Sequence, residues 1–292
     1  MESNVLVLFL LVTLSVLSAC EQQEKTLEDT PVLSADGVEI NYKVQGTGSP
    51  AVVFVHGWSG DMEYWKQQLP YFSRHYKVVA IDLAGHGESG HNREDWTMAA
   101  FGEDVVTVIE KLELDTFILV GHSMGGAVVV EAAQLMPDRV TGLVAVDAFH
   151  QLDLERTPRD VENILEPFKK DFARATQTSV KENLFAAASD SLLIANISSD
   201  MAAAPPSVAL PALRNHLLWK PGEGLPKVPA PIKLINSDMT PTDLNAAKSF
   251  EVEIFVMSGV GHFPMLEDPG IFNTLLGNVI QEFTTKAKPR GK

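Results

Sequence analysis

Residues 120–126 read VGHSMGG, and this stretch decides the fold. It follows an apolar, β-branched run over residues 116–120 and leads into a stretch of helical period over residues 124–136. A G-x-S-x-G sequence between a strand and a helix predicts a sharp turn that needs small neighbours and that exposes the serine hydroxyl at the top of a sheet. Ser123 is therefore the candidate nucleophile.

Short apolar runs recur on both sides of this motif. Stretches of helical period alternate with several of them, and a hairpin is expected around the turn at residues 36–37. Strands that alternate with helices predict an α/β fold with a mostly parallel sheet, whose strands are buried on both faces. The apolar runs are residues 51–55, 77–81, 116–120, 143–146, 232–235 and 252–256, and the helical stretches are residues 98–112, 124–136 and 271–283.

One interval breaks the alternation. Between residues 149 and 229 no strand-like run stands out, and charged helical pieces give way to short alanine and proline tracts. We interpret these residues as a mostly helical insertion. The predicted core then consists of residues 31–148 and 230–288.

A serine hydroxyl is a weak nucleophile and needs a base, and that base needs a third group to orient it. His262 is the candidate base, because the sequence GVGHF at residues 259–263 follows the last strand-like run and precedes the final helix. The other histidines near motifs have simpler interpretations. His86 is expected to stabilise a turn, His56 borders an early loop, and His122 occupies the variable position of the serine motif.

The orienting acid is expected between the serine and the histidine in chain order. Asp238 is preferred, because it follows the run at residues 232–235. Asp147 ends an earlier run and is an alternative, and Asp243 lies further along the loop after Asp238. All three stay open, because the required geometry is spatial. A carboxylate at any of these positions also fits a turn or a helix cap.

Two backbone N–H groups are candidates to stabilise a developing oxyanion. One belongs to Met124, next to the nucleophile, and the other to Trp58, in the loop that follows residues 51–55. The Trp58 indole either lines a pocket or packs in the core.

Composition limits the partners. The 292 residues carry a formal charge of −15 without a Lys/Arg cluster, so a nucleic-acid partner is not expected. The same acidic balance favours a small neutral substrate over a strongly anionic one. The sequence does not decide the oligomeric state.

The first residues form a separate unit. Residues 5–17 are almost entirely apolar, but this run is shorter than the roughly 20 residues that a membrane-spanning helix needs. The sequence LSAC follows at residues 17–20. Small residues before Cys20 resemble the lipobox of bacterial lipoproteins, although residues 1–4 lack the usual positive charge. We predict a signal peptide at residues 1–19, lipidation of Cys20, a tether at residues 20–30, and export to the bacterial cell envelope with the protein anchored to a membrane by lipid. The alternative is a chance cysteine that closes an ordinary signal peptide or short anchor.

Four motifs together resemble the α/β-hydrolase superfamily: HGW at residues 56–58, DLAGHGES at 82–89, GHSMGG at 121–126 and GHFPMLEDP at 261–269. The resemblance covers about residues 32 to 285. It implies a mostly parallel eight-stranded sheet, a helical cap over residues 149–229, and no organic or metal cofactor. Members that act on haloalkanes or epoxides carry aspartate at the nucleophile position, so Ser123 favours hydrolysis of a small carboxylic ester through an acyl-enzyme.

Other activities stay open within this resemblance. Carbon–carbon bond hydrolases, lactonases and cofactor-free perhydrolases or haloperoxidases use similar residues. A non-catalytic binding protein on the same fold is an alternative of another class, because a fold does not dictate a function.

Overall fold

The computed structural model describes residues 30–286. The predicted signal peptide at residues 1–19, the lipidation of Cys20 and the tether at residues 20–30, apart from residue 30, lie outside the described residues. Within residues 30–286, no helix combines the length and the apolar character needed to cross a membrane.

A seven-stranded sheet lies at the centre of the molecule, in the order β3-β5-β4-β6-β7-β8-β9. The edge strand β3 (Tyr42–Gln45) runs antiparallel to β5 (Val78–Ile81), and every other neighbouring pair is parallel. The α/β class and the mostly parallel sheet that the sequence predicts are confirmed. The remaining strands are β4 (Ala51–Val55), β6 (Phe117–His122), β7 (Val140–Val146), β8 (Ile232–Ser237) and β9 (Glu253–Met257).

The expectation of eight strands is corrected to seven in this sheet. The two-residue strands β1 (Val32–Leu33) and β2 (Glu39–Ile40) pair antiparallel with each other as a separate hairpin. Gly37 at the turn has a φ of +85°, a conformation that glycine adopts readily. The two short strands form hydrogen bonds with each other and not with the main sheet, so β3 is the edge strand of that sheet.

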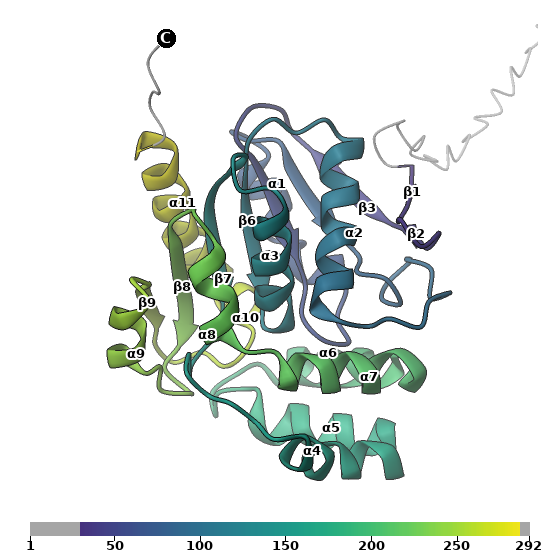
Figure 1. The fold of residues 1–292 in the computed structure, drawn as a ribbon. Coiled ribbons are helices and arrows are strands. Elements are labelled where there is room, and N and C mark those ends of the chain that lie inside the picture. The colour runs from purple at the N-terminus through teal and green to yellow at the C-terminus, as the bar shows by residue number, and fades with distance from the viewer. Residues whose placement is uncertain (1–29, 287–292) are drawn as a thin grey trace, which may run out of the picture.

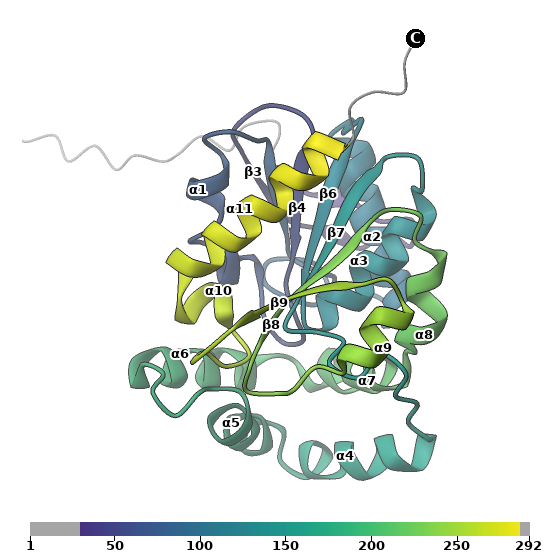
Figure 2. The ribbon, with the colours of Figure 1, turned by 90° about the vertical axis from the view of Figure 1, so that its left-hand side faces the viewer.

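Helices cover both faces of the sheet (Figures 1 and 2). The longer α2 (Met98–Lys111) and α3 (Met124–Leu135) pack on one face, where Val53 and Val55 of β4 are buried. The opposite face is covered by α11 (Pro269–Lys286), and there the alternate residues of β4 are buried. A strand buried on both faces reads as a continuous apolar run. Shorter elements on this second side are η2 (Met62–Trp65), α1 (Leu69–Phe72) and α10 (Pro264–Glu267).

The residues between β7 and β8 are helical, as predicted. Four helices lie across one end of the sheet, below the core in Figures 1 and 2, and we call them the cap helices. Tyr64 of the core donates a hydrogen bond to Asp200 in the cap, with 2.7 Å between the oxygens. The cap helices are α4 (Pro158–Lys170), α5 (Phe172–Asn183), α6 (Ser191–Ala203) and α7 (Pro206–Leu218), followed by α8 (Pro221–Gly224) and η3 (Leu225–Lys227); α9 (Leu244–Ser249) lies between β8 and β9.

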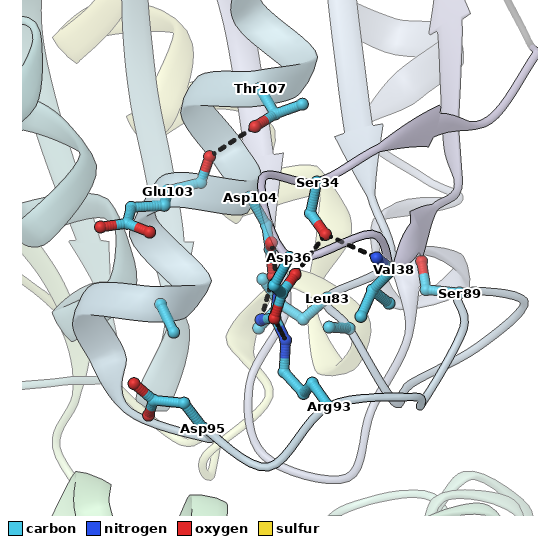
Figure 3. Close-up of polar contacts among 12 residues, drawn as sticks. Ser34, Asp36, Val38, Leu83, Ser89, Arg93, Asp95, Glu103, Asp104 and Thr107 are labelled. Atoms are coloured by element: carbon cyan, nitrogen blue, oxygen red, sulfur yellow. Dashed lines mark hydrogen bonds and ion pairs between the residues drawn. The ribbon is translucent and has the colours of Figure 1, made fainter.

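A charged cluster holds the opening hairpin against α2 (Figure 3). The Arg93 guanidinium donates two hydrogen bonds of 2.7 Å to the carboxylate of Asp104 on α2. It also donates bonds of 2.9 and 2.8 Å to the carboxylate of Asp36 in the hairpin turn. A planar guanidinium suits such paired contacts with carboxylates. Arg93 therefore ties residues 34–38 to the core.

Candidate active site

Ser123 lies at a sharp turn between β6 and α3. Its φ of 53° and ψ of −118° are rare for a residue with a side chain, and strained backbone of this kind concentrates at functional sites. A Cβ on Gly121 would lie 2.2 Å from the Gly125 carbonyl oxygen, and a Cβ on Gly125 would lie 2.4 Å from that of His56. Only glycine fits these close approaches, so the predicted need for small neighbours is confirmed.

His262 lies on the loop between β9 and α10, where its ring meets a carboxylate. Its Nδ1 is 2.6 Å from Oδ2 of Asp147. A carboxylate oxygen accepts, so Nδ1 carries the proton and Nε2 is left available to a nucleophile. Ser123, His262 and Asp147 line one cavity of about 340 Å³. The structure thus brings the candidate nucleophile, base and acid together.

Asp147 directly follows β7 and is almost fully buried, with a φ of 44°. Its Oδ1 accepts a hydrogen bond of 2.7 Å from the Ser237 amide and lies 3.5 Å from Nε2 of His150. Burial acts to raise the pKa of Asp147, but the contacts with His150 and His262 outweigh it and hold the pKa well below its usual range. The group is therefore a stable carboxylate.

The preference for Asp238 as the orienting acid was wrong. Asp238 is exposed, and its Oδ1 accepts a hydrogen bond of 3.1 Å from the Gly259 amide. The reason lies in the sheet: β7 and β8 are parallel neighbours, so both end beside the His262 loop. At the end of β8 the side chains of Asn236 and Ser237 are buried, Asn236 bonds to the backbone of Ala148, and Asp238 follows the strand at the surface.

Asp243 does not reach His262 either. Its side chain caps α9 by accepting hydrogen bonds from the amides of Asn245 and Ala246, at 2.9 and 3.0 Å. This is the helix-cap role that an aspartate in such a loop commonly fills.

The loop at Gly57 and Trp58 passes against the nucleophile. A Cβ on Gly57 would lie 3.1 Å from Cβ of Ser123. Among the described residues, neither the Trp58 amide nor the Met124 amide has a hydrogen-bond acceptor. Both N–H groups therefore keep the free donor that an oxyanion site requires.

The Trp58 indole packs against the cap helices instead of lining the cavity. Its Nε1 donates a hydrogen bond of 2.7 Å to the Ala209 carbonyl oxygen on α7. The rings of Phe168 and Phe172 meet the indole edge-to-face, with centroids 5.7 and 6.0 Å away. This loop therefore joins the core to the cap.

His122 has a role that the sequence did not indicate. Its Nε2 donates a hydrogen bond of 2.7 Å to the backbone carbonyl oxygen of His262. Burial lowers the pKa of His122 to about 3, so the ring is neutral, and the carbonyl acceptor places the proton on Nε2. The residue before the nucleophile thus fixes the backbone of the candidate base. A variable position within a motif carries no sequence signal for such a contact.

Glu267 holds the same loop from the other side. Its Oε1 accepts hydrogen bonds from the amides of Gly261 and Phe263, at 2.9 and 3.2 Å. Its Oε2 accepts from the hydroxyl of Ser189 in the cap region. The His262 amide itself donates to the Leu184 carbonyl oxygen at 2.7 Å. The loop is therefore fixed jointly by the core and the cap.

The cavity is lined by both apolar and polar side chains. Phe149 and Trp219 stack there, with ring centroids 5.6 Å apart. The apolar lining is completed by Ala148, Leu154 and Pro221, and the polar lining outside the triad consists of His150, Gln151, Arg156, His216 and Thr240. Within residues 30–286, no group of three or more histidine, cysteine or acidic side chains is placed to hold a metal ion.

The family follows from comparison with known proteins. Residues 52–275 match the model of the alpha/beta hydrolase family. This match covers most of the chain and includes the Ser123 turn, Asp147 and the His262 loop. The protein therefore belongs to the alpha/beta hydrolase family.

Three relatives show the breadth of the family. A putative esterase/lipase of Haemophilus influenzae is 39% identical over 103 residues, which is 35% of this chain and 36% of the relative. Karrikin insensitive 2 receptor CA of Petunia hybrida is 26% identical over 79% of this chain and 92% of its own. The crystal structure of a putative aryl esterase from Burkholderia cenocepacia has a TM-score of 0.73 at 25% identity, over 88% of this chain and 99% of the other. The chain spans about a third of the length of the first curated relatives it matches.

Proposed function

We propose that the protein is a serine hydrolase that cleaves a small carboxylic ester through an acyl-enzyme intermediate. One observation carries the proposal: Nδ1 of His262 is bonded to the buried carboxylate of Asp147, in the same cavity that Ser123 lines from its strained turn. Acyl transfer requires a nucleophile, a base and an acid that orients the base, and this observation supports those roles for Ser123, His262 and Asp147.

In the first half-reaction, Oγ of Ser123 attacks the ester carbonyl carbon. Nε2 of His262 takes the hydroxyl proton as the new C–O bond forms. Collapse of the tetrahedral intermediate breaks the bond to the alcohol oxygen, which receives that proton from His262. Asp147 keeps its charge throughout and stabilises the imidazolium, in agreement with its lowered pKa.

In the second half-reaction, water attacks the acyl carbon. His262 takes a proton from the water and returns it to Oγ of Ser123 as the acyl–oxygen bond breaks. The products are a carboxylic acid and the regenerated serine. No redox partner or further reactant is needed.

The negative charge of each tetrahedral intermediate needs donors close to Ser123. The amides of Met124 and Trp58 are assigned to this role, because neither has an acceptor within residues 30–286, Met124 follows Ser123 in the chain, and Trp58 follows Gly57, which packs against Ser123. One donor of this kind typically stabilises the transition state by about 3 kcal/mol.

The test is hydrolysis of 4-nitrophenyl esters from acetate to palmitate, with Ser123→Ala as the control. We expect turnover of short esters by the protein, since the cavity holds only about 340 Å³, and a loss of several orders of magnitude in the variant. An unchanged rate in Ser123→Ala would sink the proposal. Labelling by a fluorophosphonate without ester turnover would favour lactone, carbon–carbon or peroxy chemistry instead.

A binding role on the same fold is the competing class of function. A karrikin insensitive 2 receptor among the relatives keeps this alternative relevant. Folded protein that a fluorophosphonate fails to label would support it, because labelling requires an activated serine.

Export and lipid attachment at Cys20 also belong to the proposal, and they rest on the sequence of residues 5–20. Expression in bacteria with an alkyne-labelled palmitate should label the full chain but not Cys20→Ala. Equal labelling of the two would exclude attachment at this cysteine.

A further inference from the structure

Arg156 lines the cavity, is exposed to solvent, and has no hydrogen-bond or ion-pair partner among the described residues. It lies in the segment between β7 and α4 and lines the same cavity as Ser123 and His262. Its guanidinium makes no hydrogen bond or ion pair within residues 30–286. Its neighbour Glu155 instead lies 3.4 Å from Lys220. An arginine with five free donors faces whatever occupies this space.

Few negative charges offset Arg156. Asp147 is the one carboxylate that lines the cavity among the described residues, and its oxygens are held by His262 and Ser237. Three other carboxylates line an adjoining groove that shares part of the same wall: Asp153, Glu155 and Asp243. Asp243 caps α9, Glu155 meets Lys220, and Asp153 lines the adjoining groove but not the cavity itself. The charge left open inside the cavity is therefore positive.

His216 on α7 lines the cavity together with Arg156. Its Nδ1 is buried and has no partner in the described chain, which leaves Nε2 as the ring nitrogen that a bound molecule can reach. Burial, together with smaller effects of the charges of Arg156 and His262, lowers the pKa of His216 to about 4. The ring is therefore a neutral hydrogen-bonding group between the Arg156 side of the cavity and the triad.

We propose that Arg156 and His216 form a subsite for a carboxylate on the substrate, separate from the scissile ester. A guanidinium fork matches a carboxylate with two parallel hydrogen bonds, and Nε2 of His216 supplies a further donor. The substrate class is then an ester that carries a second, acidic end, such as a monoester of a dicarboxylic acid. This inference rests on the proposed function, because Ser123 must act on the other end of the same molecule.

The subsite departs from the neutral substrate that the net charge favours. The formal charge of −15 describes the whole chain, whereas the local field in a cleft depends mainly on the charges in its own walls. A cavity of about 340 Å³ brings both ends of a short dicarboxylic monoester within reach of its walls. The acidic end orients the ester against Ser123, and its recognition therefore appears mainly in KM.

The test compares paired esters. Monoethyl esters from succinate to suberate are each matched with the ethyl ester of the monocarboxylic acid of the same chain length, and acid release is followed in a pH-stat. We expect kcat/KM at the best length to favour the acidic ester by about tenfold or more. In Arg156→Gln this ratio falls to near one, mostly through a higher KM of the acidic ester. Arg156→Lys retains part of the preference, since the charge remains without the fork.

A matched control separates recognition of the acidic end of the substrate by Arg156 from the general effect of removing one positive charge. Arg159 is exposed at the start of α4 and does not line the cavity, so Arg159→Gln should keep the preference for the acidic ester. His216→Leu should reduce it. A ratio that is the same in the protein and in Arg156→Gln overturns the subsite, and so does an equal loss in Arg159→Gln.

A binding measurement keeps the two proposals distinguishable. Calorimetric titration of adipate into Ser123→Ala, and into the double variant with Arg156→Gln, reports the subsite without turnover. Binding that the second substitution weakens by about tenfold supports the subsite even if no ester is hydrolysed, in which case only the proposed function fails. Ester turnover that depends on Ser123, with equal adipate binding in the two variants, overturns the subsite and leaves the proposed function standing.

Discussion

Nδ1 of His262 lies 2.6 Å from Oδ2 of Asp147, although 115 positions of sequence separate the two residues. Parallel strands make this contact possible, because the end of β7 and the loop after β9 open at the same edge of the sheet. The tautomer of His262 depends on that one carboxylate oxygen. The proposed catalytic role of the pair can therefore be tested by a substitution that removes the acceptor oxygen and keeps the shape of the side chain.

Asp147→Asn should lower kcat by about four orders of magnitude, because an amide in place of Oδ2 can present a donor to Nδ1 and favour the wrong tautomer of His262. Kinetics on a short 4-nitrophenyl ester measure the effect. Asp238→Asn is the matched control and should stay within about twofold of the unmodified protein, since the Asp238 side chain is exposed and accepts a hydrogen bond from the Gly259 amide and not from His262. The reverse ranking of the two variants would restore Asp238 as the acid.

The lowered pKa of Asp147 also predicts a dependence of stability on pH. The pKa of this carboxyl is lower in the folded than in the unfolded chain, where it is about 3.9. Its stabilising contribution is therefore complete above about pH 4 and is lost as the pH falls further through the folded-state pKa. Thermal melts of the protein and of Asp147→Asn should thus converge below about pH 4. A difference in Tm that stays constant down to pH 2 would contradict this assignment.

How much of the site the sequence predicts depends on whether the signal is local. The Ser123 turn was found because strand, glycines and helix are contiguous, and the strands were found because burial on both faces leaves unbroken apolar runs. The choice between Asp147 and Asp238, in contrast, depends on contacts between segments that are far apart in the sequence. Both follow strands that end at the same edge of the sheet, and only the placement of the side chains shows that Asp147 is the one that contacts His262.

Contacts between segments that are far apart in the sequence account for the features that the sequence did not predict. His122 meets the His262 carbonyl across 140 positions of sequence, and no residue pattern announces that hydrogen bond. The expectation of eight strands came from the resemblance to the superfamily, whereas here β1 and β2 pair with each other and leave seven strands in the main sheet. Strands of two residues are too short for their periodicity to indicate a pairing partner.

His122→Phe tests whether the hydrogen bond from His122 to the His262 carbonyl oxygen positions the candidate base. The aromatic ring preserves volume but cannot donate to the His262 carbonyl oxygen, so the loop gains freedom next to the nucleophile. We expect kcat to fall by about tenfold to a hundredfold, with a smaller change in KM, since a misplaced base affects the chemical step. His75→Phe, at an exposed position, serves as the control. Unaltered kcat in His122→Phe would remove this residue from the positioning role.

Asp61→Asn tests whether charge repulsion at the boundary of core and cap reduces stability. Burial, the nearby charge of Asp200 on α6 and smaller effects of Asp82 and Glu63 together raise the pKa of Asp61 to about 6, although the hydrogen bond from the Glu63 amide acts to lower it. A carboxyl with a raised folded-state pKa destabilises the fold once it is ionised. That cost is absent below about pH 4 and grows as the pH rises from about 4 to 6.

Asparagine caps η2 as well as aspartate does, so the variant keeps the hydrogen bond to the Glu63 amide and loses only the charge. We expect Asp61→Asn to be more stable than the unmodified protein at pH 8 by about 1 kcal/mol, a value discounted because Asp61 is partly exposed. This corresponds to a Tm higher by about 2–4 °C. The two proteins should melt together at pH 4, and Glu94→Gln, at an exposed position, should show no such divergence. A benefit of Asp61→Asn that is equal at pH 4 and pH 8 would mean that packing, and not ionisation, is responsible.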